Sequence, residues 1–187
     1  PRLPELSEVT LSAEQKALAE SIKSGPRGQF KMSGPFAIYL HSPAFGELAQ
    51  KLGAHLRFKT SIPPRLMEFA ILCTASLWKA QYEWAMHAPM AEKQGVKPQT
   101  IRDLQAGRAP KSASRDEMTI YAFVKELYAK RRVGKANFNE AYKLLGEAGT
   151  VELVGLLGYY AMVSMTLNTF VAPLPEGMKA PFKEPGK

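Results

Sequence analysis

The stretch from Arg65 to Gln94 constrains the fold of this chain more than any other part of the sequence. Its pattern is helical throughout, it contains no glycine, and its only proline is Pro89, whose ring would kink or stagger a helix. Thirty residues are long for one helix of a globular protein. We therefore expect two helices, joined near Ser76 to Lys79, that form a central helical hairpin.

Helix signals of the same kind divide the rest of the chain, and strand patterns are almost absent. Caps and breakers such as Ser12, Ser42-Pro43, Asn137, Gly149 and Thr150 mark where helices start and stop. Residues 24–35 form a long loop. Its length favours a functional role, with its residues lying above a pocket. We predict an all-α fold with helices near residues 12–23, 43–58, 98–106, 118–128, 137–149 and from 150 onward.

The composition of the 187 residues, 45% of them hydrophobic, favours a single domain over residues 1–172. Residues 173–187 are rich in proline and read as an extended arm. Residues 153–175 carry no charge and are long enough to span a bilayer, but a buried helix or a subunit interface explains them better. We expect no membrane insertion, and a homo-oligomer that is a dimer, a trimer or a hexamer.

A formal charge of +8 favours anionic ligands. Its basic residues are diluted by acidic ones and no nucleic-acid motif accompanies them, so we expect a small anionic substrate and no nucleic acid. The single cysteine, Cys73, excludes disulfides within the chain and makes a cysteine-rich zinc site implausible. The start has no apolar signal segment, which predicts a cytoplasmic protein, or an exported one if a segment preceding Pro1 was removed.

A carboxylate and an imidazole stand one helical turn apart in the hairpin, at Glu83 and His87. Such pairs share a helix face and are common on solvated surfaces, where they have no chemical role. Tyr82 and Trp84 lie in the same turns, and their bulk would shield the pair and tune it for proton transfer. The sequence therefore nominates Glu83 and His87 as catalytic groups, with Tyr82 and Trp84 as substrate contacts.

The hairpin resembles the carboxymuconolactone decarboxylase family, in the segments PRLMEFAIL (64–72), YEWAMH (82–87) and AEKQGV (91–96). The shared pattern comprises a glutamate, an aromatic-rich turn before a histidine and a closing Gly-Val, and its specific part covers residues 63–107. The resemblance implies the helical fold that this family shares with alkyl hydroperoxidase D.

The peroxidase branch of these relatives carries two cysteines three apart, the second of them four residues before the histidine. Counting back from His87, those positions hold Ala80 and Glu83, and the relay glutamate of that branch falls on Glu68. Peroxide reduction by that route needs one thiol to attack and another to resolve the sulfenic acid. The resemblance therefore points to the decarboxylase branch, with Glu68, Glu83 and His87 as its acid–base groups.

Glu68 can reach His87 only if the two predicted helices fold back on each other. In one straight helix the two side chains would lie on the order of 25 Å apart. Two carboxylates and a histidine could also bind iron, manganese or zinc, but the family does not require a metal, and we predict neither metal nor cofactor.

Decarboxylation of a carboxylated lactone leaves a dienolate that must be protonated at carbon, which requires a proton donor and stabilisation of negative charge. A substrate with two carboxylates also needs cationic partners, for which Arg65 or Arg57 are candidates. Tyr39 and His41 could line the pocket from the preceding segment. Two alternatives stay open: a thiol peroxidase that uses Cys73, and a non-catalytic binding protein on the same fold.

Overall fold

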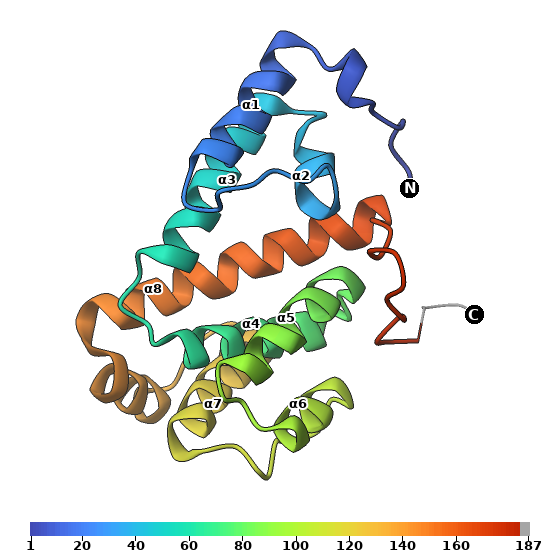
Figure 1. Cartoon of the computed structure of the whole chain (residues 1–187). Coiled ribbons are helices and arrows are strands. Elements are labelled where there is room, and N and C mark those ends of the chain that lie inside the picture. The colour runs from blue at the N-terminus through green and yellow to red at the C-terminus, as the bar shows by residue number, and fades with distance from the viewer. Residues whose placement is uncertain (184–187) are drawn as a thin grey trace.

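The computed structural model describes residues 1–183, and every regular element in that range is a helix (Figure 1). The all-α prediction is therefore confirmed. The last four residues of the predicted arm, 184–187, lie outside the described residues. The elements are η1 (Glu8–Thr10), α1 (Ala13–Ser24), α2 (Gly34–Tyr39), α3 (Pro43–Phe58), α4 (Pro64–Trp78), α5 (Gln81–Lys93), α6 (Pro98–Gln105), α7 (Arg115–Lys130) and α8 (Lys135–Phe170).

Helices α4 and α5 form the hairpin that the sequence predicts. The break falls at Lys79, which takes the left-handed conformation with φ of 50° and ends α4 without a glycine. Every residue from Leu66 to Ser76 is buried, because α4 packs against α5, α7 and α8. This helix is the centre of the fold, and its different faces pack against different helices.

Helix α8 crosses the middle of the molecule and separates two groups of helices (Figure 1). Helices α1 to α3 lie on one side of it, and α4 to α7 lie on the other. Each group has its own apolar cluster, and Met162 on α8 packs against both of them. The loop between α1 and α2 is thereby held above the start of α5, which matters for the site described below.

The prediction of two helices at 137–149 and from 150 onward is confirmed in kind, but their boundary differs. The element α8 runs from Lys135 to Phe170 and consists of two helical parts, which meet at a kink where Gly146 has non-helical backbone angles and a φ of 72° that glycine adopts readily. Asn137 does not cap a helix; its amide donates to Glu126. Thr150 does not cap one either, because its hydroxyl donates back to the carbonyl of Gly146 within the helix. The break predicted at Gly149 lies three residues earlier.

By length and composition α8 could cross a membrane, and it is the only such helix among residues 1–183. Its most apolar stretch is 56% buried against the other helices, as the prediction of a buried helix requires. Not all of α8 is covered, and Val151 and Val154 are among its exposed apolar side chains.

After α8, residues 171–183 fold back along α5 and α6 without forming a helix. Phe182 is buried, and its ring meets Trp84 edge to face at a centroid distance of 5.3 Å. The main chain of Phe182 exchanges two hydrogen bonds with the Gln81 side chain, and Gln105 donates to the carbonyl of Pro181. This segment therefore links the start of α5 to the end of α6.

Candidate functional site

The α4–α5 hairpin brings Glu68 and His87 into direct contact. Oε2 of Glu68 lies 2.7 Å from Nδ1 of His87, and both side chains are buried. The hydrogen bond fixes the orientation of the imidazole ring and places its other nitrogen, Nε2, toward solvent-accessible space. The contact predicted from the sequence exists because Lys79 reverses the chain between these helices.

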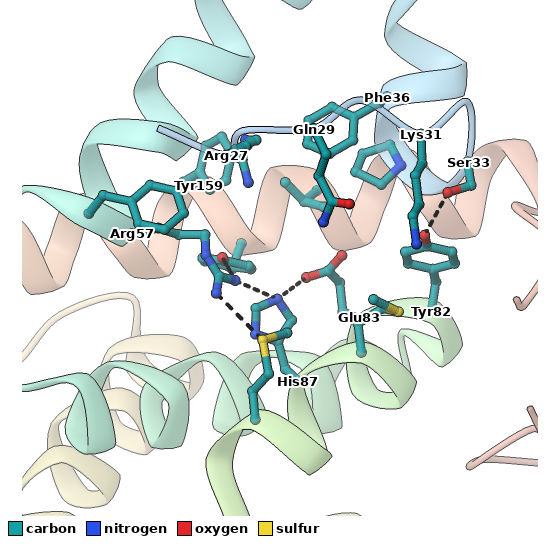
Figure 2. Close-up of a pocket in the computed structure, with 16 residues that line it drawn as sticks. Arg27, Gln29, Lys31, Ser33, Phe36, Arg57, Tyr82, Glu83, His87 and Tyr159 are labelled. Carbon is teal, nitrogen blue, oxygen red and sulfur yellow. Dashed lines mark hydrogen bonds and ion pairs between the residues drawn. The ribbon is translucent and has the colours of Figure 1, made fainter. Parts of the chain in front are cut away.

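The second carboxylate, Glu83, stands one turn before His87 on α5 and faces the other ring nitrogen (Figure 2). Oε2 of Glu83 lies 3.3 Å from Nε2 of His87, and this oxygen is buried without a well-aligned hydrogen bond. Burial lowers the pKa of His87, but the contacts with Glu68 and Glu83 outweigh it and hold the pKa above the ordinary imidazole value. The ring is therefore a group that keeps its proton to higher pH.

Arg57, in the last turn of α3, completes the cluster. Its guanidinium lies 3.3 Å from Oε1 of Glu68, 3.3 Å from Nε2 of His87 and 3.4 Å from the hydroxyl of Tyr160. Burial lowers the pKa of Arg57, but Tyr160 and Glu68 raise it by more, so the guanidinium stays charged. Arg57 and Glu68 thus neutralise each other beside the imidazole.

Two protonation states of the His87 ring are compatible with these neighbours. A protonated ring donates from Nδ1 to Glu68 and from Nε2 toward Glu83. A neutral ring with its proton on Nδ1 instead accepts at Nε2 from Arg57. Nε2 is therefore an atom at which a proton can be given up and regained without leaving the nitrogen unpartnered.

The cluster opens into a cavity of about 320 Å³ (Figure 2). The loop between α1 and α2 forms the opposite wall, as its length had suggested, and α8 closes one side. Aromatic rings make up much of the lining, which suits a flat organic ligand. The lining residues are Arg27, Gln29, Lys31, Ser33, Pro35, Phe36, Arg57, Phe58, Tyr82, Glu83, Met86, His87, Met90, Tyr159, Tyr160 and Val163.

Comparison with known families matches residues 43–126 to the carboxymuconolactone decarboxylase family. This segment belongs to that family. It contains Arg57, Glu68, Glu83 and His87, and it confirms the family resemblance of the hairpin sequence. No curated protein matches the chain. The loop wall of the cavity and α8 lie outside the matched segment, so the family alone does not define this pocket.

Of the two aromatic residues predicted to contact the substrate, one lines the cavity and one does not. Tyr82 lines the cavity, with its hydroxyl 3.3 Å from Oγ of Ser33. Gly34 makes this approach possible, because a Cβ there would lie 2.5 Å from the Tyr82 ring. Trp84 points away from the cavity and packs against Phe182, so its burial supports the helix rather than a ligand.

Arg65, Tyr39 and His41 are not brought to this pocket. Arg65 turns to the start of α7, where its guanidinium binds the carboxylates of Asp116 and Glu117. Tyr39 is buried in the N-terminal apolar cluster, edge to face with Phe36 and Phe45. His41 is exposed and lies in a separate hollow, lined by residues from the start of the chain and from 170–175. Their predicted roles as substrate contacts are therefore corrected.

Several lining residues were missed in the sequence. Tyr159 and Tyr160 sit within the uncharged run of α8, where they resemble ordinary core residues. Arg27 lies in the loop, and the only signal for it was the length of that loop. Arg57 was considered beside Arg65, and the structure selects Arg57 because it faces α5.

Cys73 lies on another face of α4, in a second cavity of about 240 Å³ between α4, α6 and α7. Burial raises the pKa of its thiol well above the ordinary range, with a smaller contribution from Glu117. Cys73 does not line the cavity of His87. A thiolate, the form that attacks peroxide, is therefore disfavoured at this position.

Within residues 1–183, no group of three or more His, Cys, Asp and Glu side chains is arranged to hold a metal ion. In the cluster itself, both ring nitrogens of His87 face carboxylates, so a metal would have to displace one of them. The absence of a metal and of a cofactor stays a prediction.

Proposed function

We propose that this protein is an acid–base enzyme of the lyase type, which acts without a cofactor on a carboxylated lactone or a similar product of aromatic-ring degradation. The observation that carries the proposal is a buried imidazole held between two carboxylates, Glu68 and Glu83, at the base of a cavity with cationic and aromatic walls. The family of the matched segment includes decarboxylases, which favours this reaction type.

The reaction that fits the site starts with loss of carbon dioxide from the bound substrate. The bond to the departing carboxylate breaks, and its electron pair delocalises into the ring carbonyl as a dienolate. A proton from Nε2 of His87 is then added at carbon, and the neutral ring regains a proton from water before the next turnover, with the Glu83 carboxylate beside Nε2 to relay it. Against the effect of burial, the contacts with Glu68 and Glu83 raise the pKa of His87 and so favour the protonated form of the donor.

Glu68 and Arg57 serve this proton transfer in different ways. Glu68 holds Nδ1 and so fixes the ring, which makes it a positioning residue. Arg57 lines the cavity beside Nε2 and presents positive charge where the dienolate forms. Its pairing with Glu68 keeps that charge in place without leaving it unbalanced.

The alternative activity, peroxide reduction, has no support in the cluster. The two positions that carry thiols in peroxidase relatives hold Ala80 and Glu83, and Cys73 faces a different cavity. A non-catalytic binding protein is the second alternative, and it predicts ligand binding without turnover.

The proposal is tested by assaying the protein against γ-carboxymuconolactone and a panel of lactones and β-keto acids, following release of carbon dioxide. Turnover by the native protein and its loss in His87→Gln would support the proposal. Glu68→Gln keeps a hydrogen-bond acceptor at Nδ1 but removes the charge, so we expect kcat to fall about 10- to 100-fold and the pH profile to move to lower pH. Binding without turnover of any panel member would favour the non-catalytic alternative.

We also propose that the chain works as a homo-oligomer. The uncovered apolar side chains on α8, with Val151 70% and Val154 50% exposed, fit a contact with another copy. Light scattering coupled to size exclusion gives the mass in solution, and a monomer at micromolar concentration would contradict this part of the proposal.

A further inference from the structure

Arg27 enters the cavity from the loop between α1 and α2, outside the segment that matches the family. Figure 2 shows it on the loop wall, beside Tyr159, with Glu83 and His87 across the cavity. Its position is therefore set by a part of the chain that precedes the matched segment. What it faces is the space in which a substrate would lie.

Aromatic rings flank the guanidinium of Arg27, but no carboxylate in the described part of the chain neutralises it, and burial lowers its pKa. Its centre lies 4.9 Å from the centroid of the Phe36 ring and 6.0 Å from that of Phe58, which are cation–π distances. Its Nε is buried and has no hydrogen-bond partner. Among residues 1–183, Arg27 forms no ion pair with a carboxylate, whereas Arg57 in the same cavity pairs with Glu68.

Helix α3 leaves room for this guanidinium. Gly53 faces it, and a Cβ on Gly53 would lie 3.0 Å from Nη2 of Arg27 and would overlap the Tyr159 hydroxyl. Any larger residue at this position would push Arg27 or Tyr159 into the cavity. The lack of a side chain at Gly53 therefore shapes the wall around Arg27.

Partly buried cations with an unused donor are costly unless an anion binds them. Arg27 offers the planar donor fork that matches a carboxylate, and the flat rings of Phe36 and Tyr159 border the same space. Arg57 shares its charge with Glu68 beside the reacting end of the cavity, whereas Arg27 has no carboxylate partner within the described residues and lies on the opposite wall, where it can bind a second anionic group of the ligand.

We infer that Arg27 binds a carboxylate of a planar ring substrate, and that this is the carboxylate retained in the product. The departing carboxylate must lose its charge to the ring, which a bound guanidinium would oppose, so the two carboxylates require different surroundings. The substrate class is thus a flat ring acid with two carboxylates, one held by Arg27 and one beside Glu83 and His87. This inference rests on the proposed function for its reaction but not for its binding site.

The test measures binding of unreactive planar acids, benzoate and phthalate, by calorimetry, with neutral benzamide as a matched ligand. We expect Arg27→Gln to weaken benzoate binding at least 10-fold and to leave benzamide binding unchanged. Arg27→Lys should recover part of the loss, because it restores charge but not the planar fork. Lys23→Gln, at an exposed cation in the last turn of α1 that does not line the cavity, is the control and should change benzoate affinity less than threefold.

Gly53→Ala tests the same wall without removing a charge and should also weaken benzoate binding, with thermal unfolding confirming that each variant folds. Benzoate affinity that is the same in Arg27→Gln and the native protein, or no measurable binding of either acid to the native protein, would overturn the inference. The two proposals fail separately. Benzoate binding that depends on Arg27 without any turnover overturns only the lyase, and turnover that depends on His87 with unchanged KM in Arg27→Gln overturns only the role of Arg27.

Discussion

The two sides of α4 carry similar residue types in different arrangements. Toward α3 and α5, Glu68 pairs with Arg57 and holds His87 at a cavity. Toward α7, Arg65 pairs with two carboxylates and Cys73 borders a second cavity. Both sides therefore combine an arginine, acidic partners and a hollow.

The difference is the group left able to exchange a proton. On the α7 side, Arg65 and its partners satisfy one another, and burial keeps the Cys73 thiol protonated. On the α5 side, the imidazole of His87 adds a titratable nitrogen that faces the cavity and has a carboxylate beside it. Ion pairs alone thus do not mark a site; a titratable atom open to a ligand does.

The largest effect is expected from His87→Gln. The substitution removes the proton donor and keeps the size and polarity of the side chain, so turnover of the substrate found by the screen should fall about 10²- to 10⁴-fold. Steady-state kinetics measure the effect, with circular dichroism as a folding control. Turnover within threefold of the native value would show that His87 is not the proton donor, and the α5 side of α4 would then no longer differ from the α7 side in its chemistry.

Activity should depend on pH with a sign that follows from the raised pKa of His87. If the protonated ring is the donor, kcat/KM is retained below the ordinary imidazole pKa of about 6.5 and falls as pH rises through the raised value. Glu83→Gln removes one of the contacts that raise the pKa and should move this fall to lower pH. Resonances of the His87 ring in NMR titrations report the same pKa, and an unshifted value would contradict the cluster's electrostatics.

An intermediate effect, on stability alone, is expected from Arg65→Met. The variant leaves Glu117, which is 2% exposed, without its cationic partner, and the free energy of unfolding should fall by about 1–3 kcal/mol. Urea denaturation measures this loss. kcat should stay within about twofold of the native value, and a tenfold fall in kcat would return Arg65 to the site.

The smallest effect is expected from Cys73→Ala. A small buried side chain is removed from the α7 side, so the free energy of unfolding should change by about 1 kcal/mol or less, with turnover unchanged. The native thiol should also react slowly with a disulfide reagent until the protein is denatured, because burial raises its pKa. Fast modification under native conditions, or loss of activity in the variant, would reopen the thiol alternative.

The hairpin and its cluster were predictable because both depend on local signals. An unbroken helical pattern of that length must turn, and the turn at Lys79 brings Glu68 to His87. The substrate contacts were not predictable, because they depend on which way a helix faces in the assembled fold. Arg57 and Arg65 differ by only eight positions, yet the first meets α5 and the second meets α7.

Other failures have the same origin. Gly146 and Gly149 both offer a place to break a helix, and only packing decides that Gly146 takes the positive φ and interrupts it. Arg27 joins the cavity through the stacking of α1 to α3 on α8, a long-range arrangement that no motif of the loop encodes. The sequence thus predicts the chemistry of the hairpin better than the walls of the pocket around it.

The docking of Phe182 on α5 bears on the order in which the protein matures. Trp84 and Gln81 stand in the first turn of the helix that carries Glu83 and His87, and both wait for a partner made about a hundred residues later. A growing polypeptide can thus form the hairpin while the first turn of α5 still lacks its contact with Phe182. Emergence of Phe182 from the ribosome would then be the event that finishes the helix bearing the imidazole.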